Sequence, residues 1–132
     1  MKLLLDTHIA YWLAVERDAL TGHEMATLVS ADQTLIVSAV SIWELRLKWH
    51  SFHRSGARKG PGDPVPVLGA LTRIGVSIIP LDAQTAAAPL LVPIDHKDPF
   101  DELLLVQAQQ EGARLLTRDR ALLAHPLAYQ PL

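Results

Sequence analysis

Four short apolar runs, separated by segments with helical spacing, constrain the fold of this chain more than any other feature. Each run has the length of a β-strand, and together they cover residues 2–5, 35–40, 76–79 and 114–116. Chains in which strands alternate with helices form parallel sheets with helices on both faces. The length of 132 residues suits one hydrophobic core. We therefore expect an α/β fold, with a central parallel sheet flanked by helices, in a single domain over residues 1–132.

The clearest helix is predicted near residues 99–111. Asp98 is a suitable N-cap, Pro99 suits the first helical position, and Gly112 ends the segment as a C-terminal cap. The stretch LLLVQA supplies the buried side of this helix. Its predicted first turn therefore holds Asp101 close to Asp98.

A second helix is predicted near residues 41–49, beginning at Ser41. The spacing from Ser41 to Glu44 matches a capping box, in which the glutamate bonds back to the backbone. Residues 53–66 are rich in Gly, Pro and cations, which predicts a mobile loop. Residues 46–59 hold five of the twelve Lys and Arg residues and no acid, so this part of the chain is its most basic segment.

The composition excludes several classes of protein. The absence of cysteine excludes disulfides and thiolate zinc sites and fits a reducing compartment, so we expect a cytoplasmic protein. Asp6 and His8 interrupt the first apolar run, which is not the pattern of a signal peptide, and no run is long enough to span a bilayer. The net charge of −2 argues against a surface that attracts nucleic acid everywhere.

Carboxylates lie near the predicted carboxyl ends of strands at several points. Asp6 and Asp119 follow strands, and Glu44 lies about one helical turn beyond another. Each of these acids, like Asp101, also has an ordinary structural explanation as a helix cap or first-turn acid. Because the strands of a parallel sheet end at one edge, where ligands bind, we expect the four to converge on one crevice. Asp82 also follows an apolar run, but we assign it to capping the next segment.

Such a cluster of acids is costly unless a cation binds it, because neighbouring carboxylates raise one another's pKa. Oxygen ligands without cysteine favour Mg²⁺ or Mn²⁺ over Zn²⁺. One or two such ions would activate a water molecule for the cleavage of a phosphate ester. The residues alone therefore favour a metal-dependent hydrolase.

Four segments, in this order and at these spacings, resemble the VapC-type toxins of the PIN-domain family. They are LLLDTHIAYWL, SAVSIWELRLK, HKDPFDELLLVQAQQEG and LLTRD, and the likeness runs from residue 1 to about residue 124. The resemblance implies a PIN-like fold and a Mg²⁺- or Mn²⁺-dependent endoribonuclease that cleaves RNA as the toxin of a type II toxin–antitoxin system. It also implies a cognate VapB-type antitoxin and, commonly, a toxin homodimer.

The resemblance also assigns the residues that bind metal and carry catalysis. Two aspartates compete for the third position, and Ala108, seven residues further on, selects Asp101 and leaves Asp98 as the helix cap with a supporting role. Glu102 departs from the pattern, since similar proteins more often have Arg there, and this leaves the substrate contact at that position open. The four acids are then Asp6, Glu44, Asp101 and Asp119.

Further side chains are candidates for supporting roles. The Thr117 hydroxyl could bond a carboxylate or a metal-bound water, with an ordinary strand threonine as the alternative. Arg46, Lys48 and Arg118 are candidates for contacts to RNA phosphates, with a solvated face as the alternative. His96 could orient Asp98 or approach the phosphate. We interpret the tryptophans as core or as a partner surface before base-stacking platforms: Trp12, Trp43 and Trp49.

Two other functions remain open from the sequence. An aspartate-nucleophile phosphatase would use Asp6, but its usual second aspartate is replaced by His8. A non-catalytic PIN-like binding module would use the acids only as helix caps. The first would form a phosphoenzyme, and the second would show no effect of divalent ions on its melting temperature.

Overall fold

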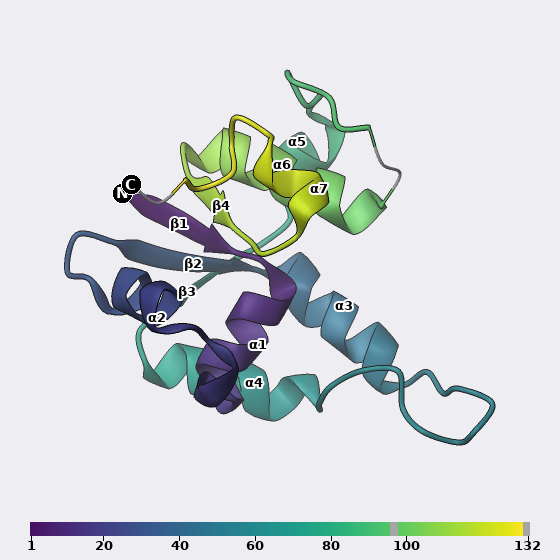
Figure 1. Ribbon diagram of the computed structural model, residues 1–132. Helices are drawn as coiled ribbons and strands as arrows, with labels where there is room; N and C mark the ends of the chain where they lie inside the picture. The colour runs from purple at the N-terminus through teal and green to yellow at the C-terminus, as the bar shows by residue number, and fades with distance from the viewer. Residues whose placement is uncertain (96–97, 131–132) are drawn as a thin grey trace.

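The fold is a parallel sheet between two layers of helices. The structure is a computed structural model that describes residues 1–95 and 98–130, so the expectation for His96 lies outside the described residues. In the described chain every strand pair is parallel, and the order across the sheet is β3-β2-β1-β4. The predicted architecture is confirmed (Figure 1). The strands are β1 (Lys2–Leu5), β2 (Thr34–Ser38), β3 (Ser77–Ile79) and β4 (Arg114–Leu116).

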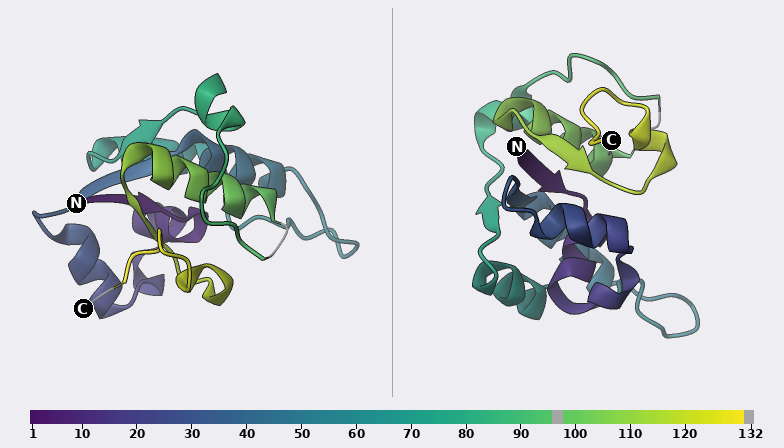
Figure 2. Two further views of the ribbon diagram at one scale, coloured as in Figure 1. Left: turned by 90° about the horizontal axis from the view of Figure 1, so that it is seen from above. Right: turned by 60° about the vertical axis from the view of Figure 1, so that its left-hand side comes forward.

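Helices cover both faces of this sheet. Figures 1 and 2 show α1, α2 and α4 on one side and α5, α6 and α7 on the other, with α3 leaving the end of β2. A short 3₁₀ turn, η1 (Arg17–Ala19), joins α1 to α2. The helices are α1 (Thr7–Val15), α2 (Gly22–Val29), α3 (Ala39–Trp49), α4 (Pro64–Arg73), α5 (Ala83–Ala87), α6 (Pro99–Glu111) and α7 (Arg120–Leu123).

The strands are apolar at consecutive positions because both faces of the sheet are buried. Leu3 and Leu5 pack with residues of α1, α2, α3 and α4 in one hydrophobic cluster. Leu4 points to the other face, where it packs with Leu104 and Leu105 of α6 in a second cluster. All three β1 leucines are completely buried. Side chains alternate between faces along a strand, so an uninterrupted apolar run is what a doubly covered sheet requires.

The ends of α6 lie where the sequence predicts them. The Asp98 carboxylate accepts a hydrogen bond of 2.9 Å from the Phe100 backbone N–H, and Pro99 is the first helical residue. Gly112 ends the helix in the left-handed conformation at φ 63°, which a glycine adopts without steric cost. These caps fix the position of the first turn of α6.

The predicted start of the second helix is wrong. The helix α3 begins at Ala39, and its cap is Ser38, whose hydroxyl accepts a hydrogen bond of 2.9 Å from the Val40 backbone N–H. Ser41 lies inside the helix and is completely buried. Glu44 is therefore not the acid of a capping box, and its side chain is available for other contacts. The strand before this helix ends at Ser38 and not at residue 40 for the same reason.

The predicted loop over residues 53–66 is also too long. Asp63 accepts a hydrogen bond of 3.0 Å from the Val65 backbone N–H, and Pro64 begins α4. Phe52 pairs with Arg58 in an isolated antiparallel bridge, so the segment before α4 has backbone pairing of its own.

Among the described helices, none is long and apolar enough to cross a membrane.

Candidate active site

The candidate site lies where the order of the strands reverses. From β1 the chain proceeds to β2 and β3 on one side, and it later places β4 on the other side of β1. The Asp6 backbone N–H donates a hydrogen bond of 2.9 Å to the Leu116 carbonyl, which joins the carboxyl ends of β1 and β4. Open parallel sheets bind ligands in the crevice at such a point.

A polar cavity of about 330 Å³ occupies this edge of the sheet. Its walls include all four acids predicted to carry catalysis, Asp6, Glu44, Asp101 and Asp119. The expected convergence of these residues is therefore observed, although they come from four different parts of the chain.

Apart from Thr117, the predicted supporting and RNA-contacting side chains divide into two groups. Asp98, Lys48 and Arg118 line the same cavity as the four acids. Arg46 lies elsewhere, in an apolar groove lined by residues of α3 and α4. Its position on α3, two residues before Lys48, places it on a different side of the helix.

Asp6 is a partly buried acid of the cavity whose pKa differs from its usual value. Its Oδ1 accepts a hydrogen bond of 2.7 Å from the Thr7 backbone N–H, and its Oδ2 accepts one of 2.6 Å from Thr117 Oγ1. Burial raises the pKa of Asp6 above its usual value, the negative charge of Glu44 adds to the increase, and the two hydrogen bonds oppose it. The predicted bond from Thr117 to a carboxylate is thus present, with Asp6 as its acceptor.

Glu44 is held by two neighbours. Lys48 Nζ lies 2.8 Å from Glu44 Oε2, one helical turn further along α3. Thr7 Oγ1 lies 2.8 Å from Glu44 Oε1 and 3.0 Å from the buried Ser41 Oγ. Thr7 was not among the site residues predicted from the sequence, where its local signal was a polar residue directly after a strand-end aspartate. These contacts fix the Glu44 side chain between α1 and α3.

Thr117 also connects Asp6 to the last acid of the cavity. The Asp119 backbone N–H donates a hydrogen bond of 3.0 Å to Thr117 Oγ1. The Asp119 carboxylate caps α7, since its Oδ1 accepts a bond of 2.9 Å from the Ala121 backbone N–H. The hydroxyl of Thr117 therefore couples the ends of β1 and β4, and both acids keep carboxylate lone pairs for a ligand.

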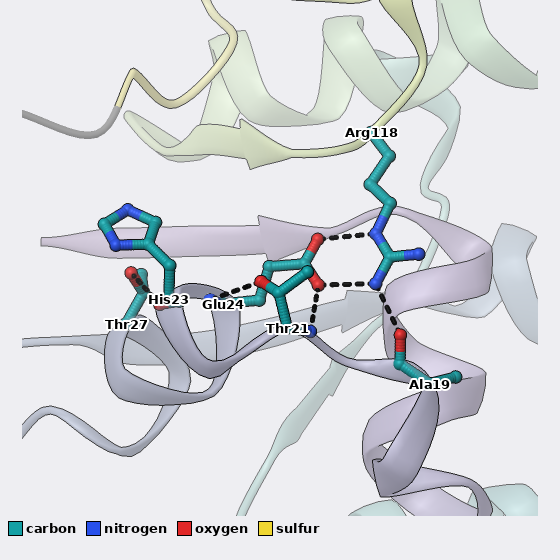
Figure 3. Close-up of polar contacts among 6 residues, drawn as sticks. All are labelled: Ala19, Thr21, His23, Glu24, Thr27 and Arg118. Carbon is teal, nitrogen blue, oxygen red and sulfur yellow. Dashed lines mark hydrogen bonds and ion pairs between the residues drawn. The ribbon is translucent and has the colours of Figure 1, made fainter.

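The Arg118 guanidinium is hydrogen-bonded to groups outside the cavity (Figure 3). Its Nε lies 2.6 Å from Glu24 Oε2, its Nη2 lies 2.5 Å from Glu24 Oε1, and Nη2 also donates to the Ala19 carbonyl. The guanidinium carbon lies 4.2 Å from the Trp12 ring centroid. The hydrogen bonds from Arg118 lower the pKa of Glu24 to about 2. Glu24, which was not among the residues predicted from the sequence, fixes Arg118 at the rim of the cavity.

The tryptophans are less buried than a core position would require. Trp12 is half-buried in the cavity wall, where its ring stacks on His8 at a centroid distance of 5.6 Å. Trp43 is 48% exposed beside Phe100, and Trp49 is half-buried. The expectation of a core position is therefore wrong for Trp43, while a role in a partner surface stays a prediction.

The donor set of the cavity fits a hard divalent cation. Its acidic ligands are all carboxylate oxygens, which Mg²⁺ and Mn²⁺ prefer. In residues 1–95 and 98–130, no three His, Asp or Glu side chains are already arranged around a metal position. Mg²⁺ commonly takes only one or two carboxylates and completes its shell with water and substrate oxygens. The raised pKa of Asp6 indicates a charge that a cation would stabilise.

Comparisons with known proteins agree with this arrangement. The model of the PIN domain family matches residues 3–126. Ribonuclease VapC22 of Mycobacterium tuberculosis is 34% identical over 126 residues, which span 93% of this chain and 91% of that protein. VapBC2 from Rickettsia felis, in a crystal structure bound to a DNA fragment from its promoter, shares the fold with a TM-score of 0.61 and 18% identity, over 97% of this chain and 96% of that one. The chain belongs to the PIN-domain family and is of the VapC type.

Proposed function

We propose that this protein is the endoribonuclease toxin of a VapBC-type toxin–antitoxin module. The observation that carries the proposal is that four carboxylates from separate elements line one cavity of a PIN domain. The relative with 34% identity is named a ribonuclease, and its match covers nearly the whole of both chains. The substrate is RNA, and the bond that is broken is a phosphodiester.

In this proposal Asp6, Glu44, Asp101 and Asp119 hold Mg²⁺ or Mn²⁺. When bound, the ion would lower the pKa of a water molecule and offset negative charge on the phosphate. The protein contributes the orientation of the ligands. Thr117 and the Thr7 backbone N–H each occupy one lone pair of Asp6, on different oxygens.

The remaining polar groups of the cavity have positioning roles. Lys48 and Thr7 hold Glu44 from two sides, one at each carboxylate oxygen. Asp98 caps α6 and thereby supports the turn that carries Asp101. Contacts from Lys48 and Arg118 to RNA phosphates belong to the proposal, whereas Arg46 would reach RNA only outside the cavity.

The partners are proposed on the same basis. The structural neighbour from Rickettsia felis is a VapBC protein, which supports a VapB-type antitoxin as the cognate inhibitor of this chain. A toxin homodimer, a cytoplasmic location and a single domain over residues 1–132 stay predictions.

The test is cleavage of total RNA by the purified protein with Mn²⁺ or with a chelator. We expect fragments only with the ion, and none from Asp101→Asn. Asp95→Asn is the matched control, because Asp95 is an exposed acid of the same region that lies outside the cavity. Cleavage by Asp101→Asn at the rate of Asp95→Asn would contradict the proposal. Formation of a phosphoenzyme on Asp6 would favour the phosphatase alternative.

A further inference from the structure

The segment between α3 and α4 folds as a hairpin that projects from the body of the protein. Figures 1 and 2 show residues 50–63 extending beyond the end of α3, and we call this segment the basic hairpin. The His53 N–H donates a hydrogen bond of 2.8 Å to the Ala57 carbonyl, and the Lys59 N–H donates one of 2.9 Å to the Ser51 carbonyl. The hairpin therefore has a defined backbone shape although most of it is exposed to solvent.

The base of the hairpin is fixed to two of the helices that line the cavity, α1 and α3. The Gly60 N–H donates a hydrogen bond of 3.0 Å to the Lys48 carbonyl, and Tyr11 of α1 donates one of 3.1 Å to the Pro61 carbonyl. A Cβ atom at Gly60 would lie only 2.7 Å from the Trp49 backbone nitrogen, so the hairpin backbone approaches the end of α3 too closely for a side chain there. The hairpin is thus held in a fixed relation to α1 and α3.

The charge of this region is strongly positive. No acid occurs between Glu44 and Asp63 in the sequence. Within residues 1–95 and 98–130, the side chains of Arg54 and Lys59 form no hydrogen bond or ion pair, and both are exposed. Two cationic side chains at the tip and arm of the hairpin are therefore available to an anion.

Aromatic rings lie among these cations. The Arg58 guanidinium carbon lies 4.1 Å from the Trp49 ring centroid and 4.8 Å from that of Phe52, which is 54% exposed. Arg58 also donates to the Trp49 carbonyl, which fixes the guanidinium against the rings. Flat aromatic and guanidinium faces are the groups on which unpaired bases stack. An acidic protein would be attracted by the charge but would not need these faces, so single-stranded RNA fits the surface better.

The hairpin is continuous with one wall of the cavity. Glu44 and Lys48 line the cavity, and Trp49 at the base of the hairpin lies about 7.5 Å along the helix axis from Glu44. Four carboxylates repel phosphates, so an RNA strand that reaches the cavity needs cations beside it. The basic hairpin supplies them on the α3 side.

We propose that the basic hairpin binds the phosphates of single-stranded RNA that flank the cleaved bond. The inference rests on the proposed ribonuclease function and adds the surface that holds the substrate outside the cavity. Long RNA strands reach both the cavity and the hairpin, whereas very short ones reach only the cavity. The affinity for long RNA should therefore depend on Arg54 and Lys59, and the cleavage of very short RNA should not.

The test uses Arg54→Gln/Lys59→Gln, with Arg73→Gln/Arg114→Gln as a control that removes the same charge near the opposite edge of the sheet. Binding to oligouridylate of about 12 nucleotides, within the usual range of single-strand site sizes, is measured against salt concentration in an Asp6→Asn background. The slope of log K against log salt should become less steep by about 1.4 in the hairpin variant, since each lost contact to a single strand removes about 0.7. The control should keep the slope of its parent.

Two further measurements make the result decisive. Arg58→Lys keeps the charge but loses the planar guanidinium, and it should weaken binding of oligouridylate while leaving the salt slope unchanged. With Asp6 intact, the hairpin and control variants should cleave an oligouridylate of about 3 nucleotides, shorter than a typical single-strand site, at the same rate. An equal salt slope in the hairpin and control variants would overturn the proposal. The proposal would also be overturned if the hairpin variant lost binding to polyglutamate but kept its binding to RNA. That result would assign the hairpin to an acidic protein. If the proposed ribonuclease function is wrong, the unmodified protein will cleave no RNA. Failure of the hairpin proposal alone would instead leave cleavage by the unmodified protein intact and show only in the salt slopes of the variants.

Discussion

Asp6 and Asp82 occupy similar local positions but differ in their surroundings. Each comes after a strand of the sheet, and each caps the next helix by accepting a hydrogen bond from a backbone N–H, of 2.7 Å at Asp6 and 2.8 Å at Asp82. Burial raises the pKa of Asp6. The bond from the Thr85 N–H lowers the pKa of Asp82, which is exposed.

The difference shows that capping does not identify a functional acid. Asp6 ends a central strand beside the point where strand order reverses, whereas Asp82 follows β3 at the edge of the sheet. Other carboxylates line the same cavity as Asp6, and Asp82 does not line that cavity. The location in the sheet, and the burial that comes with it, therefore separate an acid suited to bind a cation from one that only ends a helix.

Substitution of the two aspartates by asparagine gives the largest expected contrast. Asparagine is as good a helix cap as aspartate, so both variants should fold. Asp6→Asn should lower the rate of RNA cleavage at least about a hundredfold, because losing even an outer-sphere partner of a metal ligand costs about 10–100-fold. Asp82→Asn should leave the rate unchanged. Equal rates in initial-velocity assays of the two variants would show that cleavage does not depend on Asp6 any more than on Asp82.

Removal of the Thr117 hydroxyl, which donates a hydrogen bond to Asp6, should have an intermediate effect. Thr117→Val removes the bond to Asp6 Oδ2 and should reduce the cleavage rate by about 10–100-fold. That bond lowers the pKa of Asp6, so its loss raises this pKa further and should move the acid limb of the pH–rate profile to higher pH. Thr117→Ser should restore both the rate and the profile. A lower rate with an unshifted profile would limit Thr117 to a packing role.

A third acid at a helix start, Glu24, gives the smallest expected effect. Its folded pKa of about 2 lies below the ordinary value of 4.5, so its contribution to stability is complete above about pH 4.5 and is lost as the pH falls toward 2. Glu24→Gln keeps the capping bond to Thr21 but loses the ion pair with the 40% exposed Arg118, and should cost about 1 kcal/mol at pH 7. Urea unfolding at pH 7 and at pH 3 should show this deficit shrinking. A constant deficit would mean that the ion pair is not its cause.

The fold was predictable because its determinants are local. Apolar runs of strand length, the Asp98 and Pro99 helix start, and Gly112 at the helix end are all visible in the sequence, and the structure confirms them. The pair Asp63 and Pro64 repeats the same helix-start pattern, so the beginning of α4 could have been predicted by the same rule. The start of α4 was instead included in the predicted loop, because a Gly-rich basic segment precedes it.

The parts that could not be predicted depend on residues far apart in the sequence. Ser38 and Ser41 are equally suitable caps by residue type, but Ser38 caps the helix while Ser41 is hydrogen-bonded to Thr7 inside the protein, across 34 positions of sequence. Glu24 and Arg118 are separated by 94 positions, and no local pattern joins them. The convergence of the four acids was predictable only through the rule that parallel strands end at one edge.

The central claim is that the cavity gathers carboxylate charge that a divalent cation stabilises. The direct test is thermal unfolding of the unmodified protein and of Asp6→Asn at neutral pH, with a chelator and with increasing Mn²⁺. Because the folded pKa of Asp6 is raised, its charge opposes folding once the pH exceeds its unfolded value, so Asp6→Asn should melt at a higher temperature in chelator. Mn²⁺ should then raise the melting temperature of the unmodified protein and not that of the variant. Equal responses of both proteins to Mn²⁺ would contradict the claim.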